Sequence, residues 1–199
     1  MDSPGRKEVS HRRIVETAAR AIRRAGFSGV GVADIMKEAG LTHGGFYAHF
    51  ASRDALLTEA LSHAAADSRA RLKQRAAAKR EQVRGGSAYR ALVEAYLSES
   101  HLSAPEGGCP VAALLSEIPR QAQEVRAAAA SCVSGLFSLV KDSLPNGISK
   151  DEVAVVTSQL VGALQLARAL GDNARGKSVL AASRRALLAR HGERSSSDA

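Results

Sequence analysis

Apolar residues recur every three or four positions along most of the chain, and this period predicts amphipathic α-helices. In the first such segment, about residues 8–25, Ile14, Ala18 and Ile22 lie on one stripe. Gly26 follows, and glycine commonly ends helices because it adopts a left-handed conformation. Arginines are expected to fill most of the outer face, at positions Arg12, Arg13, Arg20, Arg23 and Arg24. The first predicted element is therefore a strongly basic amphipathic helix.

Two short helices are predicted next, at about 32–39 and 43–50, and Gly40 lies between them as a C-terminal stop. Thr42 precedes the second of these helices and is a residue type that caps helix N-termini. Ser52 is placed to cap a fourth, longer helix in the same way. Residues 31–50 thus have the layout of two short helices joined by a tight, glycine-containing turn.

The remaining chain keeps the helical period and breaks near 85–87, at 103–108 and at 144–147. Further helices are expected at about 88–101, from Pro110, after Pro119, and at 149–170 and 173–190. Residues 193–199 are expected to form a disordered tail. Aromatic residues make up only 4% of the sequence and there are five prolines, which favours long helices over a β-rich fold. The prediction is an all-α fold of about nine helices.

Positive charge is concentrated in the first part of the chain. Residues 1–84 hold 16 Lys/Arg against 9 Asp/Glu, whereas residues 85–199 hold 12 against 11. A basic region joined to a near-neutral one indicates a polyanionic partner for the first region. The alternative is a solvated basic face that only aids solubility.

Several classes of protein are disfavoured. Two cysteines without a C-x-x-C pair do not form a disulfide framework, and the first residues lack the apolar core of a signal peptide. We expect no membrane span, because no uninterrupted apolar run approaches the roughly 18 residues that cross a bilayer. The sequence has no phosphate-binding glycine loop, no nucleophile elbow and no metal-ligand spacing among its histidines. We therefore expect a cytoplasmic protein that is not an enzyme and has no metal, cofactor or membrane partner.

The second helix of a helix-turn-helix enters the major groove of DNA, so one face must be apolar and the other small or polar. Helix 43–50 fits this requirement, because Phe46 and Phe50 lie four residues apart and share a face. The groups expected to face DNA are His43, Gly44, Gly45, Tyr47 and His49. Two adjacent glycines cost about 1 kcal/mol each in a helix, and close approach to a phosphate backbone would explain them. Alternatively, they form a turn before a helix that starts at Phe46.

The stretch DIMKEAGLTHGGFYAHF at residues 34–50, followed by SRDALL at 52–57, resembles the tetracycline-repressor (TetR/AcrR) family. The resemblance covers about residues 8–68 and implies a helix-turn-helix DNA-binding domain there. It implies that Thr42 caps the recognition helix and binds a phosphate. Further DNA contacts are implied for His43, Gly44, Tyr47, His49 and Arg53. Gly31 departs from the family, which often has Thr or Ser there, so a backbone amide must replace the hydroxyl or the contact is lost.

Two of these implied roles have structural alternatives. His49 could pack against the first helix, since histidine is intermediate in burial. Arg53 could lie on a solvated helix face, although the helix dipole disfavours a cation near a helix N-terminus.

For residues 69–192 the resemblance implies a helical domain that binds a small-molecule inducer and pairs through its last two helices with a second copy. Such a homodimer suits a palindromic, double-stranded DNA operator. The candidate pocket residues are Tyr89, Tyr96, His101, Phe137 and Gln165, and their alternative role is in the core or at the rim. The expected function is that of a ligand-responsive repressor.

Two other functions stay open. Cys109 precedes Pro110 at a predicted helix N-terminus, where a thiolate is stabilised, so one alternative is a repressor that senses oxidants or electrophiles. A cysteine with only a packing role is the alternative at this position, and Cys132 is expected in the core. A non-specific architectural DNA-binding protein is the remaining candidate.

Overall fold

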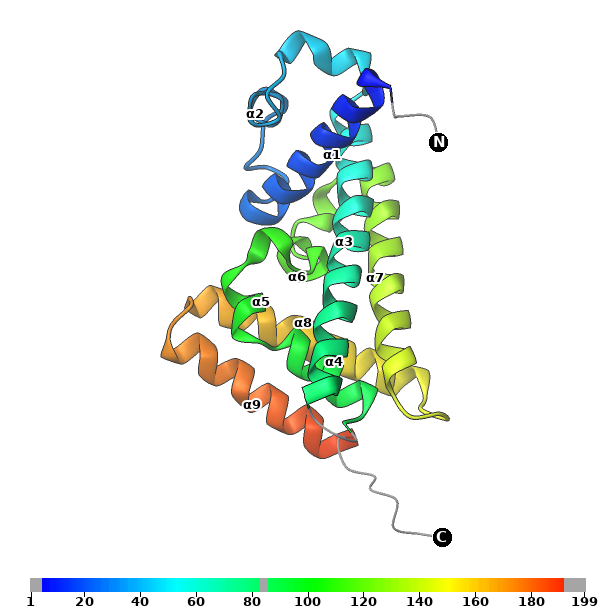
Figure 1. Ribbon diagram of the computed structural model, residues 1–199, viewed down its shortest axis with the longest axis vertical. Coiled ribbons are helices and arrows are strands. Elements are labelled where there is room, and N and C mark those ends of the chain that lie inside the picture. Colours follow the sequence, from blue (N-terminus) through cyan, green and yellow to red (C-terminus); the bar gives the residue numbers. More distant parts are fainter. Residues whose placement is uncertain (1–4, 83–85, 192–199) are drawn as a thin grey trace. The chain divides into compact units, whose positions relative to one another are not determined.

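The computed structural model describes residues 5–82 and 86–191 of the chain (Figure 1). Within these residues it contains nine α-helices and three 3₁₀ helices and no strand, which confirms the all-α prediction. The tail predicted at 193–199 lies outside the described residues. The elements are α1 (Arg6–Ala25), α2 (Val32–Glu38), η1 (His43–Ala48), α3 (Arg53–Gln82), α4 (Ala88–Tyr96), α5 (Glu99–Ser103), η2 (Pro105–Gly107), α6 (Pro110–Leu114), η3 (Ile118–Arg120), α7 (Gln123–Ser143), α8 (Lys150–Leu170) and α9 (Ala174–His191).

Two elements differ from the sequence prediction. The helix expected over 88–101 is split into α4 and α5, and Ser98 caps α5 by accepting a hydrogen bond from the His101 backbone N–H at 3.2 Å. The short helix expected at 43–50 is the 3₁₀ helix η1. Short apolar periodicity does not distinguish an α-helix from a 3₁₀ helix or locate a one-residue interruption.

The described residues group by contacts into two units, each with its own interior. The first unit comprises 5–67 and 105–132, and the second comprises 68–82, 86–104 and 133–191. The segment 105–132 therefore belongs with the N-terminal helices, although it lies far from them in sequence. This grouping differs from the two contiguous domains expected at 8–68 and 69–192.

The core of the first unit follows the predicted apolar stripes. Ile14, Ala18 and Ile22 of α1 are fully buried, as is Phe27 just beyond the helix end. Arg23 was expected on the basic outer face but is only 5% exposed. Its guanidinium donates to the carbonyl oxygens of Ala19 at 2.9 Å and Gly108 at 3.2 Å. The position beside the apolar stripe turns inward because these carbonyl groups and the Asp67 carboxylate, 3.4 Å from Nη1, replace water.

In the second unit α8 and α9 form a helical hairpin, with their chains running side by side (Figure 1). Gly171 ends α8 with a φ of 92°, a conformation that favours glycine. By length and composition α8 is apolar enough to cross a membrane, contrary to the sequence expectation, and 44% of its apolar window is buried within the protein. Val156, Leu160 and Leu164 carry that buried face.

Candidate nucleic-acid interface

The surface of η1 separates sharply into an inner and an outer side. Phe46 and Phe50 are 2% and 3% exposed, and their rings stack with centroids 5.6 Å apart. Tyr47 lies on the opposite side with 73% of its surface exposed, and His43 and Gly44 are exposed as well. The two phenylalanines therefore anchor η1 while its other side is open to a partner.

Neither glycine in η1 is required by the protein itself. A Cβ atom added to Gly44 would meet nothing within 4 Å, and one added to Gly45 would make only ordinary contacts, the nearest at 3.7 Å from Thr42 Oγ1. Neither residue has a positive φ. The alternative that these glycines form a turn before a helix starting at Phe46 does not hold, because η1 begins at His43. A smooth, side-chain-free surface at this place suits close approach of another molecule's backbone.

Thr42 occupies the N-cap of η1, but its hydroxyl forms no capping hydrogen bond, contrary to the implied role. The reason is the 3₁₀ geometry, in which the Gly45 N–H already donates to the Thr42 carbonyl at 3.1 Å. The Thr42 side chain is exposed and lies at the start of the same open surface.

His49 at the end of η1 is half-buried beside α1, which agrees with the packing alternative. Its ring lies 5.9 Å from that of His11, and His11 stacks on Phe50 at 4.5 Å and pairs with Glu59 at 2.7 Å. Within residues 5–82 and 86–191 the buried His49 Nδ1 has no hydrogen-bond partner. Burial lowers the pKa of His49, and electrostatic interactions with His11 and Lys7 act in the same direction.

Gly31 immediately precedes α2, and Arg53 is the first residue of α3, which follows η1. The Arg53 guanidinium donates to the carbonyl oxygens of Phe27 and Val30, so it binds the loop before α2. This contact differs from both the implied phosphate clamp and the solvated face. Gly31 is exposed at the N-cap of α2, where its lack of a side chain leaves only backbone groups for a partner.

The outer surface of α1 remains basic without Arg23. The exposed cations at its N-terminal half and middle are Arg6, Lys7, Arg12, Arg13 and Arg20. Arg24 is also exposed, but it pairs with Glu38 at 2.9 Å and Glu106 at 3.1 Å. A short helix with an open polar side, next to a basic helix, has the chemistry of a DNA-reading surface.

Two family models match the chain. The model described as bacterial regulatory proteins of the tetR family matches residues 14–60, and the one described as the tetracyclin repressor-like C-terminal domain matches residues 85–183. The chain belongs to the TetR family. It is thus a DNA-binding transcriptional regulator. A search of curated protein sequences found no match.

Solved structures of TetR-family and other regulators share the fold. The reduced form of Escherichia coli NemR is 22% identical with a TM-score of 0.72, covering 90% of this chain and 95% of the other. A TetR-family regulator from Cytophaga hutchinsonii is 18% identical with a TM-score of 0.73, covering 96% and 98%. The fatty acid degradation regulator FadR from Bacillus halodurans is 16% identical with a TM-score of 0.61, covering 96% and 100%.

In the second unit of this TetR-family chain, two of the five predicted pocket residues lie together. Tyr96 is fully buried and His101 is 4% exposed, and their rings meet edge to face at 4.9 Å. His101 Nδ1 donates to the Tyr96 carbonyl at 2.7 Å. Burial lowers the pKa of His101 to about 4, and Arg168 and Arg75 contribute in the same direction. His101 is therefore neutral near pH 7.

The other three predicted pocket residues lie on three different helices, α4, α7 and α8. Phe137 on α7 is 36% exposed, and Gln165 on α8 is half-buried. Tyr89 is 1% exposed, and its hydroxyl donates to the Leu187 carbonyl at 3.1 Å. Burial raises the pKa of Tyr89 to about 12, so the hydroxyl remains a donor. A hollow of 380 Å³ in this unit is lined by Ala77, Arg80, Glu81 and Gly86, and by none of the five.

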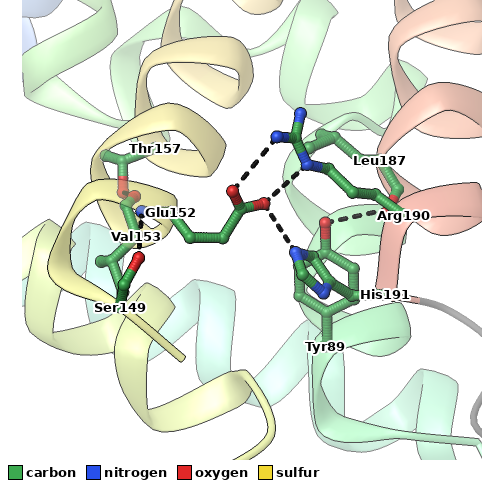
Figure 2. Close-up of polar contacts among 8 residues, drawn as sticks. All are labelled: Tyr89, Ser149, Glu152, Val153, Thr157, Leu187, Arg190 and His191. Atoms are coloured by element: carbon green, nitrogen blue, oxygen red, sulfur yellow. Dashed lines mark hydrogen bonds and ion pairs between the residues drawn. The ribbon is translucent and has the colours of Figure 1, made fainter. Parts of the chain in front are cut away.

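The sequence pattern missed a polar cluster beside Tyr89 (Figure 2). Glu152 on α8 accepts hydrogen bonds from Arg190 and His191 on α9, with a shortest distance of 2.7 Å to each. The bond from His191, with the charge of Arg190, holds the pKa of Glu152 below its usual value. The 38 and 39 residues that separate these partners leave no local signal in the sequence.

The two cysteines are buried in the first unit. Cys109 is the N-cap of α6 and is 5% exposed, while Cys132 is 8% exposed with its Sγ 3.7 Å from the Leu61 carbonyl. Thiol reactivity requires exposure as well as a lowered pKa, so burial counts against a reactive Cys109. In residues 5–82 and 86–191 no group of three His, Cys, Asp or Glu side chains is placed to hold a metal ion.

Proposed function

We propose that this TetR-family regulator is a ligand-responsive repressor that binds a palindromic operator as a homodimer in the cytoplasm. The observation that carries the proposal is the exposed side of η1, where Tyr47, His43 and Gly44 face outward from a phenylalanine anchor. Thr42 and the basic α1 surface would supply phosphate contacts, while the η1 side chains would read base edges.

An apolar stripe on α8 supports the homodimer. Val155, Leu166 and Leu170 are 43%, 62% and 37% exposed, and Gly162 lies between them on the same face of the helix. Large apolar side chains exposed along one face mark a surface that another protein covers. A second copy would place two η1 helices at the spacing that a palindrome requires.

Release by a small molecule is part of the proposal. A ligand can dissociate the repressor only if it binds more tightly to a conformation with the wrong η1 spacing. Compounds that raise the melting temperature should therefore also lower operator affinity. A stabilising compound that leaves operator affinity unchanged would speak against it as the inducer.

The test of DNA recognition uses the duplex that the full-length protein enriches from a random library, with fluorescence anisotropy as the readout. Tyr47→Ala should weaken binding by about tenfold or more, because a base-edge or methyl contact is worth about 1–3 kcal/mol. Tyr47→Phe separates the ring from the hydroxyl. Phe137→Ala removes an exposed aromatic of the second unit and should bind like wild type. Unchanged affinity of Tyr47→Ala would refute the assignment of η1.

The two alternatives predict different results in the same assay. An architectural protein would bind all duplexes with similar affinity, so no sequence would be enriched. A thiol sensor would lose operator binding on treatment with hydrogen peroxide or N-ethylmaleimide, and Cys109→Ser would abolish that response. Because Cys109 is buried, we expect wild type and Cys109→Ser to respond alike.

A further inference from the structure

The loop at residues 26–31 joins α1 to α2 and is bound by side chains from distant parts of the first unit. Glu117, between α6 and η3, accepts hydrogen bonds from the backbone N–H groups of Phe27 at 3.0 Å and Ser28 at 3.5 Å. Arg53 donates to the carbonyl oxygens of Phe27 and Val30 in the same loop. A carboxylate therefore holds the donors of this loop, and a guanidinium holds its acceptors.

Gly26 makes room for the Glu117 carboxylate. It ends α1 with a φ of 77°, and a Cβ atom added there would lie 2.3 Å from Glu117 Oε1. A negative charge at a helix C-terminus is disfavoured by the helix dipole. The two N–H groups beyond the helix end explain why the carboxylate is nevertheless found there.

The segment that carries Glu117 is fixed to α1 at two more points. Arg24 pairs with Glu106 in η2 at 3.1 Å and with Glu38 in α2 at 2.9 Å, and both bonds raise the pKa of Arg24. The buried Arg23 donates to the carbonyl of Gly108 at 3.2 Å. These side-chain contacts therefore fix residues 105–120 against the C-terminal end of α1.

We propose that Glu117 is a positioning residue for sequence-specific DNA binding. Its carboxylate fixes the 26–31 loop, the loop sets where α2 begins, and α2 packs against η1. Base-edge contacts depend on alignment within a groove, whereas charge contacts with phosphates tolerate displacement. The inference rests on the proposed function, and it extends the DNA-reading unit to a residue 90 positions from the loop it holds.

The experiment compares wild type with Glu117→Ala, Glu117→Gln and the control Glu124→Ala, which removes an exposed carboxylate in the first turn of α7. Anisotropy is measured on the library-enriched duplex and on a scrambled duplex of the same composition. Hydrogen exchange follows the amides of Phe27 and Ser28. The Gly26 amide is the internal reference, because it donates to the Ile22 carbonyl at the end of α1 and not to Glu117. Circular dichroism verifies that each variant is folded.

For Glu117→Ala we expect about tenfold weaker binding to the enriched duplex and little change on the scrambled one, since two charge-assisted bonds are lost. The Phe27 and Ser28 amides should exchange at least about tenfold faster, while Gly26 stays protected. Glu117→Gln retains an acceptor oxygen and should restore most of the specific affinity. Glu124→Ala should match wild type.

Two results would overturn the inference. One is an unchanged ratio of specific to non-specific affinity in Glu117→Ala after its two amides have lost protection. The other is equal weakening on both duplexes, which reports a smaller folded fraction and hence only a structural role. If wild type itself shows no preference for any duplex, the proposed function fails and the positioning role fails with it.

Discussion

Replacing His101 with asparagine should flatten the dependence of folding stability on pH between about 6.5 and 4. In the folded chain His101 is 4% exposed, and burial lowers its pKa from 6.5 to about 4. The positive charges of Arg168 and Arg75 add to this effect, while the bond to the Tyr96 carbonyl opposes it. The imidazole therefore stays neutral at pH values where an exposed histidine is already protonated.

The sign of the effect follows from proton binding in the two states. Between pH 6.5 and 4 the unfolded chain carries a proton on His101 and the folded chain does not. Acidification therefore favours the unfolded state, and the free energy of unfolding falls by up to about 1.4 kcal/mol per pH unit. Across this window the loss amounts to about 3 kcal/mol. Above pH 6.5 His101 is neutral in both states and contributes no pH dependence.

The assay is urea unfolding followed by circular dichroism at a series of pH values, with fixed ionic strength and fixed protein concentration. Asparagine places an amide donor near the position of Nδ1, so the bond to the Tyr96 carbonyl can persist without a titrating group. His43→Asn removes an exposed imidazole of η1 and should follow the wild-type curve. Any cost of packing in His101→Asn shifts its curve equally at all pH values. Parallel curves for wild type and His101→Asn between pH 6.5 and 4 would refute the reasoning.

Two further predictions concern α8. Leu166→Glu places a charge on the exposed apolar stripe and should weaken self-association by about 100-fold or more, because a buried unpaired charge costs several kcal/mol. Analytical sedimentation should then find a monomer whose circular dichroism is unchanged. The control Ala130→Glu, on the exposed surface of α7, should remain dimeric. A Leu166→Glu variant that is still a dimer would contradict the prediction. Glu152→Gln removes the charge bound by Arg190 and His191 (Figure 2) and should lower the melting temperature by about 2–4 °C at pH 7. Because the folded pKa of Glu152 lies below the usual 4.5, that difference should begin to shrink as the pH falls below 4.5 and should vanish below the folded pKa. A difference that acidification leaves unchanged would exclude the ion pair as its cause.

Local signals predicted most helix boundaries correctly. Gly26 and Gly40 have the positive φ values expected of helix stops, 77° and 69°. Ser52 accepts a hydrogen bond from the Ala55 N–H at 3.0 Å, as expected for a cap. These features act over three or four residues, so they are visible in a short stretch of sequence. The split between α4 and α5 was missed because Ser98 interrupts a continuous apolar period without a glycine or proline.

The inner and outer sides of η1 follow from the local spacing of Phe46, Tyr47 and Phe50, and this prediction is confirmed. Features formed by distant residues, in contrast, could not be predicted. No local pattern points to Glu117, because the N–H groups that donate to it lie 90 and 89 residues away. The five pocket candidates share only that they are bulky or polar residues on aliphatic helices, and this property does not specify which of them contact one another. Tyr96 and His101, five residues apart, contact each other through their rings and through a backbone carbonyl.

The arginines of the first unit illustrate the same limit and affect the DNA-binding argument. Counted in sequence, each contributes to a basic surface, but Arg23 and Arg53 bind backbone carbonyls and Arg24 binds two glutamates. These contacts hold all three guanidinium groups against other parts of the unit. We expect them to affect DNA binding through the shape of the 26–31 loop and the placement of η1. We expect the charged phosphate contacts to come mainly from the exposed cations of α1. The salt dependence of binding should then reflect these few charges rather than the whole basic excess of the N-terminal region.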